Sequence, residues 1–246
     1  MEKFKQMMKG FFAYVWECIK GSFLAGLTYA MAGAILTMLV VQEGKPFSEQ
    51  VTWCVVVIVC AIAYNGLLAW GYGGQNYEML VSGNMKRMSA MQFGSEYKIS
   101  SHSYVKEYRV WKGFVMGALC SVIAIVFVLI FGANQELINS AFLQETTLSN
   151  GWGVVVIIGF FVCGWAILPF YCAMMAGYIV SYYLALLIAI LPIFAFGGFY
   201  IGGAYAKRNK AIRAQEMADR AAAAQAAKPK KINYGGLPGT KPRKKK

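Results

Sequence analysis

The chain has 246 residues, of which 58% are hydrophobic, and its formal net charge is +13. Soluble domains contain about 45–50% apolar residues, so this composition excludes an ordinary soluble domain. Several uncharged runs reach about 20 residues, the length that a helix needs to span a bilayer. They predict an all-α, polytopic helical membrane protein with four to five transmembrane helices.

Residues 1–20 are predicted to form an amphipathic helix that lies in the membrane interface. Apolar residues, among them Phe4 and Trp16, recur at the spacing of one helix face, while Lys5 and Lys9 belong to the polar side. A basic helix that is rich in Phe and Trp on its other face binds at the boundary between headgroups and acyl chains.

The transmembrane domain is expected to cover residues 21–206. Its four clear spans are 22–41, 51–72, 113–132 and 152–171. A polar segment, 73–112, separates the second span from the third.

Lysine and arginine are distributed unevenly between the segments outside these spans. The N-terminal segment has four, segment 73–112 has six and the tail from 207 has thirteen, whereas the loops 42–50 and 133–151 together have one. Cytoplasmic loops carry the excess of positive charge. The N-terminus, segment 73–112 and the tail are therefore predicted to lie in the cytoplasm, next to the plasma (inner) membrane.

The apolar stretch that follows the fourth span has to return the tail to the cytoplasm. One more plain span would put the tail outside, and the region is too short for two. Since proline removes a backbone donor and disfavours helix before it, the sequence favours a re-entrant hairpin over 177–206 that breaks at Pro192. The rival interpretation is a fifth full span, kinked at Pro192, with an external tail.

A set of residues is expected to shape this region or a small cavity beside it. Asn65 is the strongest polar group within a span, and an amide in lipid needs a partner across a helix contact. Gly198 and Gly202 would allow close helix packing. The set is Asn65, Pro169, Tyr171, Ser181, Tyr182, Pro192, Gly198 and Gly202. The ordinary alternative for the tyrosines is a place in the aromatic belt at the membrane surface.

Catalytic and metal-binding patterns are missing from the sequence. His102 is its one histidine, and no nucleophile elbow, phosphate loop or zinc motif is present. We expect no cofactor, no metal and no enzymatic activity. All acidic residues lie outside the predicted spans, which argues against an ion-coupled transporter.

The tail, residues 207–246, is predicted to be helix-prone to about 227 and disordered beyond it. Such a juxtamembrane polybasic segment binds anionic lipid headgroups, which is the partner that we favour over RNA or the ribosome. The basic residues expected to contact lipid or a partner are Lys5, Lys9, Lys86, Arg87, Lys207, Arg208, Lys210, Arg213, Lys244, Lys245 and Lys246.

These features predict a non-enzymatic membrane subunit or scaffold. Its basic cytoplasmic face would meet anionic lipid, other membrane subunits or a second copy of itself. Two alternatives stay open from the residues alone: a small pore or uncoupled transporter, and an insertase-like assembly factor with an RNA- or ribosome-binding tail.

Overall fold

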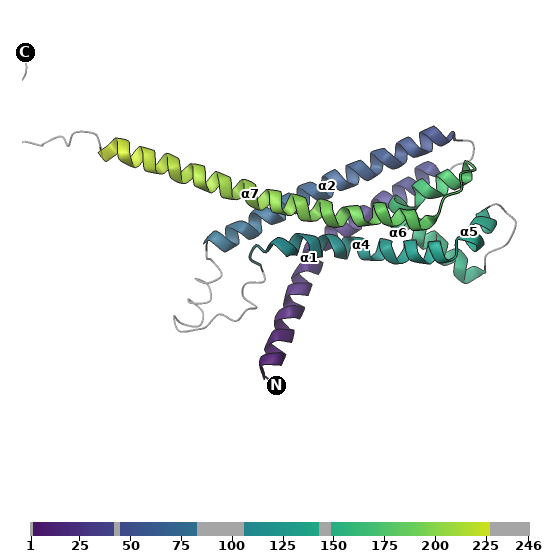
Figure 1. Cartoon of the computed structure of the whole chain (residues 1–246), viewed down its shortest axis with the longest axis horizontal. Helices are drawn as coiled ribbons and strands as arrows, with labels where there is room; N and C mark the ends of the chain where they lie inside the picture. Colours follow the sequence, from purple (N-terminus) through teal and green to yellow (C-terminus); the bar gives the residue numbers. More distant parts are fainter. Residues whose placement is uncertain (1, 42–44, 83–105, 143–148, 227–246) are drawn as a thin grey trace, which may run out of the picture. The chain divides into compact units, whose positions relative to one another are not determined.

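The computed structural model describes residues 2–41, 45–82, 106–142 and 149–226, and its elements in these ranges are helical. They are α1 (Glu2–Val40), α2 (Phe47–Ser82), α4 (Val110–Ala133), α5 (Gln135–Phe142), α6 (Asn150–Met175), the 3-10 turn η2 (Tyr182–Leu184) and α7 (Ala185–Ala226) (Figure 1). In this part of the chain five helices, α1, α2, α4, α6 and α7, are long and apolar enough to cross a membrane. The prediction of an all-α polytopic membrane protein is confirmed.

Two helices run further than the sequence predicted. α1 continues through residue 20 without a break, and α2 extends ten residues beyond the expected end at 72. Gly73 and Gly74 do not end α2, because both are buried against α7: a Cβ atom on Gly73 would lie 1.9 Å from the carbonyl oxygen of Tyr200. Glycine lets two helix backbones approach closely in a membrane.

The bundle has two ends, which serve as reference points below. At the α5 end, α1 stops and α2 begins, and Gln50 of α2 donates a hydrogen bond to the Val40 carbonyl oxygen (3.4 Å). α4 also stops there, next to α5. At the Lys112 end, α2 stops beside the start of α4, and the Tyr108 amide donates to the Asn76 carbonyl oxygen (3.1 Å).

α6 turns back on itself inside the bundle. The ring centroids of Phe160 and Tyr171 lie 5.2 Å apart, although in a straight helix eleven residues would separate them by about 16 Å along the axis. Six consecutive residues between them, 163–168, are buried, so neighbours surround this turn of α6 on every side. A surface helix would bury one face only.

Both ends of α6 lie at the α5 end of the bundle, as Figure 1 shows. Gly151, at its start, lines a pocket with Asn134, which follows the last residue of α4. After its other end, the Val180 carbonyl oxygen accepts a hydrogen bond from Gln135, the first residue of α5 (2.9 Å). α6 is therefore a re-entrant helix, and the expectation that 152–171 crosses from one side to the other is wrong.

Pro169 lies in the returning arm of α6 and favours the bend. Proline has no amide hydrogen, so the carbonyl oxygen of Trp165, four residues earlier, loses its helical hydrogen bond. Sharp kinks in helices occur at such positions. α1 packs directly on the backbone of α6 just before the bend. A Cβ atom on Gly33 of α1 would lie 2.8 Å from the carbonyl oxygen of Phe161, so only glycine allows this approach.

α7 runs through the bundle from the α5 end to the Lys112 end. The Tyr183 ring, just before α7, packs on Gly132 near the end of α4, and Tyr200 packs on Gly113 near its start. The predicted hairpin at Pro192 is therefore wrong: Pro192 lies inside a continuous helix.

The reason for this difference lies in how Pro192 packs. Pro192 is buried and packs against Gly117 of α4. A Cβ atom on Gly117 would lie 2.8 Å from the Pro192 carbonyl oxygen. Proline is tolerated in membrane helices where neighbouring helices cover the freed backbone groups. The chain turns instead at Gly177, which has a φ of +86° and so adopts the left-handed conformation that glycine tolerates best.

Residues Met1–Lys207 and Arg208–Lys246 form two separate units, and α7 belongs to both. In the second unit the helix continues to Ala226, and its side chains from 210 onward are exposed. This agrees with the helix propensity of that part of the tail.

Candidate functional site

The bend of α6 is the most completely buried part of the bundle and is the candidate site. Trp165 lies there with 2% of its surface exposed, and its ring centroid is 4.7 Å from that of Tyr29 in α1. Tyr29 lies near the middle of α1's membrane segment, so α6 reaches about half-way through the bundle. Thr37 of α1 fixes the entering arm by donating a hydrogen bond to the Phe160 carbonyl oxygen (2.9 Å).

Asn65 of α2 lies beside this contact and bonds across a helix interface, as its position in a span required. Its Oδ1 is 2.8 Å from the Thr28 hydroxyl oxygen, and the Tyr29 hydroxyl is close to the same amide. Nδ2 is buried and meets no acceptor in this orientation. If the amide turns by 180°, Nδ2 donates to the Thr28 oxygen while the Thr28 proton goes to the Ala25 carbonyl oxygen, 2.8 Å away. The hydrogen-bonding groups of Asn65 and Thr28 then have partners within α1 and α2, which indicates that Asn65 serves the packing of these two helices.

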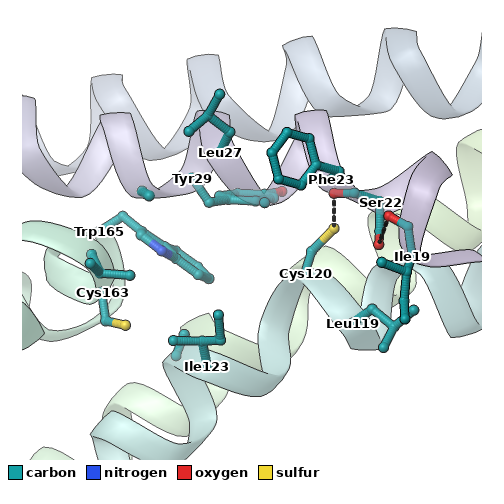
Figure 2. A pocket seen from close by; sticks show the side chains of 14 residues that line it. Ile19, Ser22, Phe23, Leu27, Tyr29, Leu119, Cys120, Ile123, Cys163 and Trp165 are labelled. Atoms are coloured by element: carbon teal, nitrogen blue, oxygen red, sulfur yellow. Dashed lines mark hydrogen bonds between the residues drawn. The ribbon is translucent and has the colours of Figure 1, made fainter. Parts of the chain in front are cut away.

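A pocket of about 370 Å³ lies between α1 and α4 beside the bend (Figure 2). Figure 2 shows Trp165 and Cys163 at one end of it and Ser22 at the other, where the Cys120 thiol donates to the Ser22 carbonyl oxygen (3.5 Å). The lining is apolar apart from these groups. Phe23, on its rim, is 70% exposed. The pocket can hold an apolar group such as part of an acyl chain, but it has no charged side chain to receive an ion.

The Asn65 contact predicts a modest effect on stability. Asn65→Leu should lower the free energy of unfolding by about 0.6 kcal/mol, the average for hydrogen bonds between membrane helices. Thr28→Val should cost as much, and the double variant no more than either, since both remove the same bond. Thermal unfolding in detergent measures this. The matched control is Tyr64→Leu, on an exposed position next to Asn65. Additive losses would show that the two residues act separately.

The residues of the predicted tyrosine cluster pack together in a turn at the α5 end. The Tyr182 amide donates to Gln135 Oε1 (3.2 Å), and its hydroxyl donates to the Met174 sulfur (3.7 Å). Ser181 accepts a hydrogen bond from the Tyr183 amide and caps η2. Tyr171 packs on Phe160, so it holds the two arms of α6 together.

The glycines expected to form a seam contribute unequally. A Cβ atom on Gly198 would meet nothing within 4 Å, while one on Gly202 would meet the Trp70 ring at 2.8 Å. Gly203, which was not among the expected residues, approaches α2 more closely than either: a Cβ atom on it would lie 2.0 Å from the Trp70 carbonyl oxygen. The rotation of α7 about its own axis decides which of its glycines faces α2. The four-residue spacing of Gly198 and Gly202 in the sequence does not reveal that rotation.

The basic residues that the structure describes are mostly free to meet lipid or a partner. Lys5, Lys9, Arg208, Lys210 and Arg213 are exposed. Lys207 instead forms an ion pair with Glu78 of α2. Outside the described residues lie Lys86, Arg87, Lys244, Lys245 and Lys246.

Sequence reasoning missed Thr28, Tyr29 and Trp165, which build the candidate site together with Asn65. Tyrosine, threonine and tryptophan inside apolar runs were the available signal. Comparisons of the chain with protein-family models, curated proteins and solved structures find no match.

Proposed function

We propose that this protein is a non-enzymatic membrane scaffold that presents a basic face to a partner. The observation that carries the proposal is the second unit itself: from Arg208 to Ala226 it is helical, and its side chains are exposed from 210 onward. An exposed helix that carries Arg208, Lys210 and Arg213 offers these cations to a partner with negative charge.

The beginning of α1 supports the same proposal. Phe4, Phe11 and Trp16 are more than half exposed, and Figure 1 shows that this part of α1 runs at a steep angle to the other helices. Exposed aromatic side chains on a basic helix are satisfied in the membrane interface. The Lys20 ammonium lies 5.6 Å from the centre of the Trp16 ring, where an interfacial cation is stabilised.

Charge favours the cytoplasm for the Lys112 end. Among the described residues, the α5 end has one basic side chain, Lys45, which pairs with Glu49 at 3.7 Å. The Lys112 end has Lys106, Arg109, Lys112 and Lys207 near the membrane. The positive-inside rule then puts that end in the cytoplasm, next to an inner (plasma) membrane. Because α6 is re-entrant and α7 returns, the tail begins on that same side.

Affinity purification tests the proposal. The full chain, extracted in mild detergent, should retain a partner at fixed stoichiometry. Replacing Arg208, Lys210 and Arg213 by glutamine should remove this partner, because the exposed cations contact it, whereas Gln215→Ala on the same helix should not. Retention of the same proteins by both variants would contradict a role for the basic helix.

A small pore or uncoupled transporter is the second candidate, and the re-entrant α6 is the observation that favours it. Irregular or re-entrant segments at membrane depth often line a substrate path. Reconstitution into liposomes separates the two candidates. Flux of small solutes through the purified chain, reduced by Trp165→Ala, would favour the pore and contradict the scaffold.

A further inference from the structure

Two cysteines from different helices lie in contact at the α5 end of the bundle. The thiols of Cys54 in α2 and Cys172 in α6 are hydrogen-bonded to each other. Both side chains are buried, each with 1% of its surface exposed. Since a thiol is a weak donor and a weak acceptor, this hydrogen bond by itself adds little stability.

The packing of the two helices explains why these cysteines meet. α2 begins at the α5 end and the returning arm of α6 ends there, so the two segments run in opposite directions. The ring centroids of Phe47, at the start of α2, and Tyr178, after the end of α6, lie 5.5 Å apart. Cys54 follows Phe47 by seven residues, about 10 Å along α2, and Cys172 precedes Tyr178 by six. The ring contact and the thiol contact therefore belong to one antiparallel register.

The other four cysteines have different surroundings. Cys18 lies at the Lys112 end, Cys60 is exposed on α2, and the Cys120 thiol donates to a carbonyl oxygen of α1. Cys163, at the bend of α6, lies at the other end of the apolar pocket from Cys120 (Figure 2). The structure describes all six cysteines, and the fold brings these two thiols, one from α2 and one from α6, into contact.

The location of the pair determines the redox conditions around it. Cys54 lies about two turns from the start of α2, and Cys172 lies in the last turn of α6. Both are near the end of the bundle that the uneven charge puts outside the cytoplasm. Disulfides form and persist in the oxidising compartment on that side of an inner membrane, whereas cytoplasmic thiols are kept reduced.

We propose that Cys54 and Cys172 form a disulfide bond that fastens the returning arm of α6 to α2. The sulfur atoms of a disulfide are about 2.05 Å apart, so thiols already in hydrogen-bonding contact need only a small movement of their side chains. The bond adds a covalent link to the packing that keeps α6 re-entrant. The site goes beyond the proposed scaffold role, because it uses no residue of the tail and would remain if no protein partner existed.

Thiol–disulfide exchange forms this bond, and the oxidant is the disulfide of a thiol oxidoreductase in the oxidising compartment. The Cys172 thiolate attacks one sulfur of that disulfide and releases the other sulfur as a thiolate. The Cys54 thiolate then attacks the Cys172 sulfur and releases the oxidoreductase. Two electrons and the two thiol protons pass to the oxidoreductase, which leaves as a dithiol. Because the folded pair is buried, the exchange takes place during assembly, before α6 packs against α2.

Counting the free thiols of the full chain in whole cells tests the disulfide. The cells are quenched with acid, the protein is denatured, and each free thiol is alkylated with a maleimide that adds a fixed mass. Four of the six cysteines should react before reduction and all six after it. Mass spectrometry of the unreduced digest should find the peptides of Cys54 and Cys172 joined. Six reactive thiols in the quenched parent chain would overturn the proposal.

Serine variants identify the two partners. Cys54→Ser leaves Cys172 without its partner, so all five remaining thiols should react, and Cys172→Ser should give the same count. Cys163→Ser is the matched control on the same helix: its disulfide should persist, so three thiols should react. Five reactive thiols in Cys163→Ser would show that the bond involves another cysteine and would overturn the proposal. Loss of partner capture by the tail variants with an unchanged thiol count would contradict the scaffold alone.

Discussion

A cysteine at Ile179 should react with a membrane-impermeant maleimide on intact cells, and a cysteine at Gly151 should react as well. The two positions lie beyond opposite ends of the bend in α6, yet both are exposed at the α5 end of the bundle. A helix that crossed the membrane would separate them by the full bilayer. In the re-entrant helix they share one side, so we expect labelling of both to the same extent, in a background that lacks the six native cysteines.

Cysteines at Val81 and Met217 are the matched controls for the other side. Both side chains are exposed, Val81 near the end of α2 and Met217 in the continued α7. They should stay unlabelled in intact cells and react after permeabilisation. Labelling of Gly151→Cys but not of Ile179→Cys would contradict the re-entrant α6. Labelling of Met217→Cys but not of Val81→Cys would contradict the course of α7.

Gly203→Ala should produce a large loss of stability from a single methyl group. A Cβ atom there would lie 2.0 Å from the Trp70 carbonyl oxygen and 2.8 Å from its carbonyl carbon, so α2 and α7 have to move apart. Overpacking of this kind costs about 1–3 kcal/mol, and more where backbone must shift. The expected result is a clearly lower unfolding temperature in detergent and less folded protein in the membrane.

Gly198→Ala is the control for this substitution. It adds the same methyl group to the same helix five residues earlier, at a position that faces nothing within 4 Å. Replacing glycine by alanine in a helix usually stabilises it, by up to about 1 kcal/mol. Gly198→Ala should therefore be neutral or slightly stabilising. Equal losses in the two variants would show that α2 and α7 do not meet at Gly203.

Much of the architecture followed from the sequence because it depends on local composition. Uncharged runs of about 20 residues determine where helices can lie in lipid, since backbone groups there have to bond within the segment. The helix beyond Lys207 was likewise predicted from its alanine-rich residues. Asn65 could be picked out because an amide inside a span needs a partner, although the sequence did not name Thr28.

The uneven distribution of charge favoured a re-entrant segment near the C-terminal end over a fifth span with an external tail. It did not identify the apolar stretch that turns back, and the sequence assigned the hairpin to 177–206 in place of α6. Pro169 and Pro192 each lie inside a long apolar helix, so the sequence gives the same reason to expect a break at both. One lies in a sharply bent helix and the other in a helix that runs on, so the proline alone does not decide the outcome.

Tertiary contacts decided between them. α6 can turn at mid-depth because Gly33 and Gly164 let α1 approach its backbone, and because Tyr171 on the returning arm packs on Phe160. α7 continues past Pro192 because Gly117 of α4 covers the backbone there. Lys112 is a further example. The sequence shows a lysine at the edge of a span, but its burial depends on the helices that pack over it. Hydrophobicity acts locally and is visible in the sequence, whereas close packing depends on which residues from distant segments come to face one another.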